Sequence, residues 1–164
     1  MSAAGARRVV VAAVGSEFRR DDGAGPAVLD RLGADLGGVE VLGALASPWH
    51  LLGAWDGADL AIVVDAVAAG DEPGAVHVVE VDTSVPPKAH GRTAPQTSSH
   101  GGGVIEVLHI AAALGTAPAH VVLVGVAGED FGEGRGLSPS ASHAVERAAW
   151  VVGELAGLAS VRSP

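Results

Sequence analysis

Three short segments of this sequence place acidic or imidazole side chains where an α/β enzyme would use them. The first is the loop from Gly15 to Gly25, which follows an apolar run and contains Asp22. The second is Asp65, which directly follows the apolar residues 62–64, and the third is His100, which precedes three glycines. Two carboxylates and one imidazole suit a divalent transition metal such as nickel or zinc. They also suit metal-free acid–base chemistry, and their spacing leaves both interpretations open.

The surrounding pattern predicts strands that alternate with helices. Runs rich in β-branched residues predict five strands, over residues 8–14, 39–42, 60–67, 75–81 and 120–126. Short connections with proline or glycine at their ends separate these runs from helix-like segments. Four helices are expected: one that begins at Pro26 and buries Val28, Leu29, Leu32 and Leu36, one over 50–55, one over 102–114 that buries Leu114, and one that begins at Ser138-Pro139.

This order of elements indicates one α/β domain over residues 1–164. Helices on both sides of the strands give a three-layer α/β/α sandwich with a mixed, mainly parallel five-stranded sheet. The turn over residues 68–74 is too short for a helical crossover, so the third and fourth strands are expected to be antiparallel neighbours. The fourth strand alternates polar and apolar residues and is expected at an edge of the sheet.

The candidate residues fall at the carboxyl ends of strands, where open α/β sheets bind their ligands. A structural explanation also fits Asp22, since a carboxylate near a helix N-terminus gains roughly 0.3–1 kcal/mol. Asp65 is harder to explain in that way, because a carboxylate after a buried strand costs desolvation unless it is paired. Asp21 looks like the structural acid that turns the loop. Among the seven histidines, His100 stands out because it lies between a long polar connection and a helix.

The composition argues against several classes of protein. The chain has no cysteine, which removes disulfides, thiolate-bound zinc, iron–sulfur clusters and a cysteine nucleophile. A net charge of −9 argues against nucleic acid or an anionic membrane as partner. No apolar run reaches the ~18 residues needed to span a bilayer, and no signal peptide is evident, so a cytoplasmic protein is expected. Phosphate-loop and serine-nucleophile motifs are incomplete, which favours direct attack by water in any hydrolysis.

Several of these segments together resemble a known family. The loop reads Gly15-Ser-Glu-Phe-Arg-Arg-Asp-Asp-Gly-Ala-Gly25, the strand ends in Ile62-Val63-Val64-Asp65, and Ser99-His100-Gly101 precedes a helix. Near the end, Gly136-Leu137-Ser138-Pro139 opens the last helix. The combination resembles the hydrogenase maturation endopeptidases over nearly the whole chain. Members of that family trim the C-terminal extension from the large subunit of nickel–iron hydrogenases.

The resemblance implies an activity and a site. Asp22, Asp65 and His100 would bind nickel and form the catalytic centre of an aspartyl-type endopeptidase that activates a hydrogenase. The nickel would be the ion already present in the precursor, and the partner would be that large-subunit precursor. Neither nucleic acid nor a membrane is expected as a partner, and a monomer is expected.

The sequence departs from the family pattern at two points, and two alternatives remain. Ser16 replaces the usual asparagine, and residues 43–48 replace a turn rich in glycine and threonine, which leaves the hydrogenase group open. One alternative is a metal-binding maturation chaperone without protease activity. The other is a magnesium-dependent, receiver-like phosphoryl-transfer domain, which usually needs a lysine at the end of a later strand. The one lysine here, Lys88, lies in the long connection.

Overall fold

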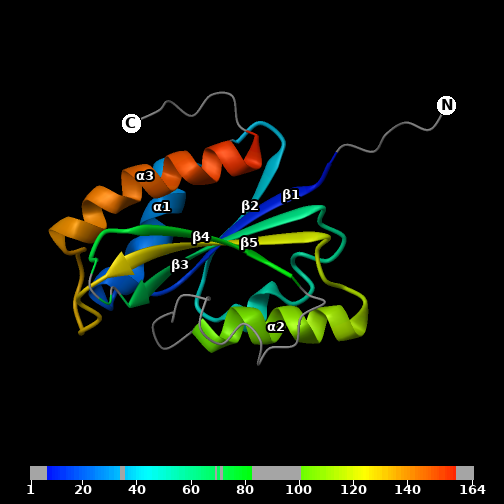
Figure 1. Ribbon diagram of the computed structural model, residues 1–164, viewed down its shortest axis with the longest axis horizontal. Helices are drawn as coiled ribbons and strands as arrows, with labels where there is room; N and C mark the ends of the chain where they lie inside the picture. The colour runs from blue at the N-terminus through cyan, green and yellow to red at the C-terminus, as the bar shows by residue number, and fades with distance from the viewer. Residues whose placement is uncertain (1–6, 34–35, 69, 71, 83–100, 158–164) are drawn as a thin grey trace.

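The computed structural model describes residues 7–33, 36–68, 70, 72–82 and 101–157. The N-terminal half carries alternating strands and short helices, and the C-terminal half carries the two longest helices (Figure 1). In chain order the elements are β1 (Val9–Val14), η1 (Arg20–Gly23), α1 (Ala24–Leu32), β2 (Val39–Leu45), η2 (Pro48–Leu51), β3 (Leu60–Ala68), β4 (Val76–Val81), α2 (Gly101–Leu114), β5 (His120–Gly128) and α3 (Pro139–Ala156).

The strands form one five-stranded sheet in the order β2-β1-β3-β5-β4. Strands β2, β1, β3 and β5 are parallel, and β4 is antiparallel to β5. Helices α1 and α3 cover one face of the sheet, and α2 covers the other (Figure 1). The predicted three-layer fold with a mixed, mainly parallel sheet is therefore confirmed. None of the helices in the described ranges is long and apolar enough to cross a membrane.

The central strands are apolar along their whole length because each contributes to two cores. In β1, Val9 and Val11 pack under α1 and α3, whereas Val10 and Ala12 pack toward α2. All six residues of β1 are buried, as expected for a strand covered on both faces. This arrangement leaves polar side chains to the strand ends, so chemistry is confined to the rims of the sheet.

The predicted pairing of the third and fourth strands is wrong. Strand β5 lies between β3 and β4 and pairs with both. After leaving β3, the chain crosses the end of β5. There the Gly74 amide donates a hydrogen bond to the Ala127 carbonyl, and the Ala127 amide donates one to the Ala75 carbonyl. Strand β5 is buried along almost all its length, whereas β4 exposes His77, so β4 takes the edge. The predicted edge position of β4 is confirmed.

Three expectations about the helices also need correction. Helix α1 ends at Leu32, because Gly33 adopts a φ of +82°, and Leu36 is buried beyond the helix. The short helix is a 3-10 turn at Pro48–Leu51 that ends before the predicted range does. Leu114 is the last residue of α2 and is 64% exposed rather than buried.

Asp21 ties the loop after β1 to the loop before α3, which supports its predicted structural role. Its Oδ1 accepts from the Ser138 amide at 2.7 Å. Its Oδ2 accepts from the Ser138 hydroxyl at 2.8 Å and from the amides of Glu129 and Asp130 at 2.8 and 3.1 Å. The same hydroxyl caps α3 by accepting from the Ala141 amide. Burial tends to raise the pKa of Asp21, but these hydrogen bonds outweigh it and hold the pKa below its ordinary value.

We predict that Asp21→Asn lowers the free energy of unfolding by about 2 kcal/mol at pH 7, because an amide nitrogen replaces an oxygen that faces only donors. The lowered pKa means that the stabilisation is present above the ordinary pKa of 3.8 and is lost as the pH falls through the lowered value. Denaturant unfolding of both proteins between pH 7 and pH 3 measures the difference, which should shrink below about pH 4.

Asp56→Asn is the matched control, since Asp56 is exposed and precedes the first residue of β3, at the end of the strands away from Asp21. Its free energy of unfolding should stay within about 0.5 kcal/mol of the wild-type value. Equal stability of Asp21→Asn and the wild type at pH 7 would show that Asp21 does not hold the two loops together.

Candidate functional site

Asp22 is fully buried at the carboxyl end of β1. It lies in η1, and its Oδ2 accepts a hydrogen bond from the Ser16 amide at 3.0 Å. Gly15 makes this fold of the loop possible, because its φ is +138° and a Cβ there would lie 2.1 Å from the Asp22 carbonyl oxygen. The loop therefore closes on Asp22 and turns its carboxylate toward the sheet rather than toward solvent.

Asp65 lies in β3 and is 5% exposed. Neither of its carboxylate oxygens meets hydrogen-bond geometry with any residue that the structure describes. Burial and the neighbouring charge of Asp22 raise the pKa of Asp65 to about 8, and the adjacent Ala66 amide offsets only part of the rise. A buried carboxyl group of this kind is an unusual cost unless a ligand completes its coordination.

The close packing of α1 on the sheet brings these two acids together. A Cβ at Gly25 would lie 2.9 Å from the Val64 carbonyl oxygen and 3.1 Å from the Val14 carbonyl oxygen. The first turn of α1 therefore rests directly on the end of β1 and on the middle of β3, and it holds Asp22 within electrostatic reach of Asp65. The sequence alone predicts only that Asp22 and Asp65 lie near the carboxyl ends of strands of the same sheet.

His100 lies outside the described residues, as does most of the long connection before it. Helix α2 begins at Gly101, so His100 directly precedes it in the chain. The first turn of α2 packs against η2, since a Cβ at Gly103 would lie 2.7 Å from the Pro48 ring. Within the described ranges, no group of three histidine, aspartate or glutamate side chains is arranged to hold a metal ion. The structure thus brings together two of the three predicted ligands.

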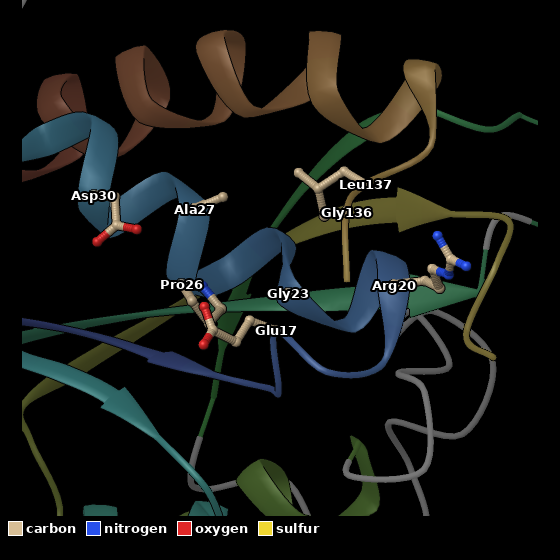
Figure 2. Close-up of a pocket in the computed structure, with 8 residues that line it drawn as sticks. All are labelled: Glu17, Arg20, Gly23, Pro26, Ala27, Asp30, Gly136 and Leu137. Atoms are coloured by element: carbon tan, nitrogen blue, oxygen red, sulfur yellow. The ribbon is translucent and has the colours of Figure 1, made fainter. Parts of the chain in front are cut away.

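A small pocket lies beside the loop that carries Asp22, and no pattern in the sequence indicates it. It is lined by Glu17, Arg20, Gly23, Pro26, Ala27, Asp30, Gly136 and Leu137. Figure 2 shows the carboxylates of Glu17 and Asp30 toward the α1 side and the guanidinium of Arg20 at the other end. Its volume of about 140 Å³ is below the roughly 300–1,000 Å³ of ordinary ligand pockets. It has room for one side chain.

The paired acids can serve two kinds of chemistry. With no cation present, the raised pKa keeps Asp65 protonated at neutral pH, so Asp65 can donate a proton to a bound group. A divalent cation would remove the cost of a second buried negative charge and take the oxygen ligands that lack protein partners. The donor set therefore fits a metal ion held from outside the sheet.

The raised pKa of Asp65 predicts the pH dependence of stability in the metal-free protein. Its contribution is fully present below the ordinary pKa of 3.8 and is lost as the pH rises toward about 8. We therefore expect Asp65→Asn to unfold at a higher temperature than the wild type at pH 8, and this difference should be smaller at pH 5. Calorimetry at pH 5 and pH 8 measures this. A large loss of stability at both values would show that Asp65 is a structural tie.

Comparisons with known proteins agree with this architecture. A family model described as hydrogenase maturation protease matches residues 28–154. Among solved structures, the chain is similar to the hydrogenase maturating endopeptidase HybD from E. coli, with 27% identity over 90% of this chain and 91% of that chain and a TM-score of 0.75. It is similar to an endopeptidase from Escherichia coli solved in solution, with 28% identity over 88% and 89% of the two chains and a TM-score of 0.75.

A third similar structure is the [NiFe] hydrogenase maturation protease HycI from Thermococcus kodakarensis. Its identity is 26% over 94% of this chain and 95% of that chain, with a TM-score of 0.65. No curated protein matches the sequence. The family model spans Asp65 and His100 but begins after Asp22, whereas the structural matches cover most of the chain. On the extent of the family match and these shared folds, the chain belongs to the hydrogenase maturation protease family and is a peptidase.

Proposed function

We propose that this peptidase removes the C-terminal extension from the nickel-loaded precursor of a nickel–iron hydrogenase large subunit. Asp22, Asp65 and His100 bind the nickel of that precursor. The observation that carries the proposal is the buried Asp65 carboxyl group, which lies beside Asp22 and whose oxygens meet full hydrogen-bond geometry with none of the described residues. The protein acts as a monomer in the cytoplasm, and the ion arrives with the substrate.

The chemistry of the donor set supports nickel as the ion. Two carboxylates and an imidazole are hard-to-borderline ligands, and such a set leaves coordination positions for groups of the precursor. A bound divalent ion can polarise a carbonyl group or activate water. In this proposal an unloaded precursor is not cleaved, because without nickel its scissile bond is not positioned at the acid pair.

The reaction needs one water molecule and one proton relay. Water adds to the scissile carbonyl carbon, the carbon–nitrogen bond breaks, and the leaving amine takes up a proton. Once the precursor's nickel ion offsets their negative charge, Asp22 and Asp65 are both carboxylates, and we assign to them the transfer of the proton from the water to the amine. A precursor docked by its nickel is held in position for this attack.

The test uses a nickel-loaded large-subunit precursor from the same genome. The precursor is mixed with the protein, and its intact mass is followed by mass spectrometry. We expect the wild type to release a C-terminal peptide from the loaded precursor and not from the nickel-free one. Asp22→Ala should lower the rate by about 100-fold or more, the range for loss of an acid–base group.

Asp56→Asn, at the end of the strands away from the acid pair, should cleave at the wild-type rate and serves as the matched control. Nickel-dependent binding without any change of mass would contradict the protease proposal and favour the chaperone. Equal cleavage of the loaded and nickel-free precursors would contradict nickel recognition.

The two remaining ligands give a separate prediction. Asp65→Asn and His100→Ala should each abolish cleavage of the loaded precursor while the thermal unfolding transition stays cooperative. Asp65→Asn removes the ionisable carboxyl group but keeps the side-chain volume, and His100 directly precedes α2 in the chain. Circular dichroism and cleavage are measured on the same samples. Wild-type cleavage by either variant would remove that residue from the site.

A further inference from the structure

Four large apolar side chains are strongly exposed among the described residues, namely Phe18, Trp49, Val78 and Leu114. Leu114 ends α2 at the end of the molecule away from the acid pair, and Val78 lies in β4, the outermost strand. Phe18 lies on the loop that carries Asp22, four residues before it, and is 57% exposed. Single exposed apolar residues are common, so exposure alone does not mark a binding surface.

What distinguishes Phe18 is that the protein holds this exposed ring in place. The guanidinium of Arg135 lies over the ring, 4.5 Å from its centre. A carboxylate oxygen of Glu17 lies 3.3 Å from a nitrogen of that guanidinium. The Phe18 carbonyl accepts from the Gly134 amide at 2.8 Å, and its own amide donates to the Ser16 hydroxyl at 3.3 Å. The loop is therefore ordered from both sides around a side chain that adds little to either core.

An ordered, exposed aromatic ring has lost its conformational entropy before a partner arrives. Contacts made by such a group cost less on binding than contacts made by a mobile side chain. Aromatic and arginine side chains are also the residues enriched at the energetic centres of protein interfaces. The cation–π contact at an exposed site contributes modestly to folding, so its value here lies in orienting the ring.

The pocket of Figure 2 continues this surface. Glu17 and Arg20, which flank the Phe18–Arg19 segment, line the pocket, and Gly136, which follows Arg135, lines it as well. The pocket takes one side chain, and the ring beside it offers an apolar face. Together they suit a polypeptide segment rather than a small molecule.

We infer that the Phe18 ring, oriented by Arg135, docks an apolar side chain of the precursor next to the acid pair. The inference rests on the proposed function, because that function requires a protein substrate to approach Asp22. The loop between β1 and α1 carries both Phe18 and Asp22, so we expect a precursor segment that approaches Asp22 to pass the Phe18 ring. The partner is thus an apolar residue in the segment of the precursor near the cleaved bond.

The test compares Phe18→Ala with Leu114→Ala, which removes an equally exposed apolar side chain at the end of the molecule away from the acid pair. Steady-state cleavage of the nickel-loaded precursor gives kcat and KM. We expect Phe18→Ala to raise KM about tenfold while kcat stays within about twofold of wild type. Leu114→Ala should match the wild type, and Phe18→Leu should keep most of the affinity. Thermal unfolding of the variants serves as a check on folding.

A second measurement separates docking from proteolysis. Binding of the nickel-free precursor, which is not cleaved, is followed by sedimentation, and Phe18→Ala should weaken it about tenfold. Cleavage by the wild type with an unchanged KM for Phe18→Ala would overturn the docking inference and leave the protease proposal intact. Binding that depends on Phe18, with no cleavage of the nickel-loaded precursor, would instead overturn the protease proposal and leave the docking inference intact. A change in the oligomeric state of the free Phe18→Ala protein, with KM unchanged, would also overturn the inference, because the ring would then serve self-association.

Discussion

The direct contact of the first turn of α1 with the end of β1 and the middle of β3 is the constraint on which the site depends. Gly25 leaves no room for a Cβ against the carbonyl oxygens of Val64 and Val14. Because the helix starts so close to the sheet, Asp22 is buried beside Asp65 instead of being solvated at a helix terminus. The close contact leaves two acids buried next to each other with few hydrogen-bond donors. Burial and the charge of Asp22 therefore raise the pKa of Asp65.

Asp21 and Asp65 show how the same residue type takes opposite roles. Asp21 is surrounded by donors from the β5–α3 loop, and its pKa is lowered. A Cβ at Gly128 would lie 2.6 Å from the Cβ of Asp21, so the loop fits closely around that acid. Asp65 has no such donors, and its pKa is raised. A carboxylate satisfied by the protein stabilises the fold, whereas one left unsatisfied is available to a ligand.

Much of this could be predicted from the sequence, because the strongest signals are local. The apolar runs predicted all five strands, and the Ser138-Pro139 pair predicted the start of α3. The place of β5 between β3 and β4 could not be predicted, since a short turn fits either a neighbour or a step across one strand. The meeting of Asp22 with Asp65 was predicted from the rule that ligands bind at strand ends. The contact between the Phe18 ring and Arg135 was missed, because the two residues lie more than a hundred positions apart in the sequence.

The β5–α3 loop is attached to the loop of Asp22 at more than one point. Its backbone satisfies Asp21 through Glu129 and Asp130, and a few residues later it holds Phe18 through Gly134. Arg20, whose φ of +50° is rare for a residue with a side chain, sits between these attachments and bonds to Gly134 through its amide. Backbone strain of this kind persists only where surrounding contacts enforce it. One loop therefore fixes the loop of Asp22 at two points, so a substrate held on the Phe18 ring would meet acids whose positions are already set before it binds.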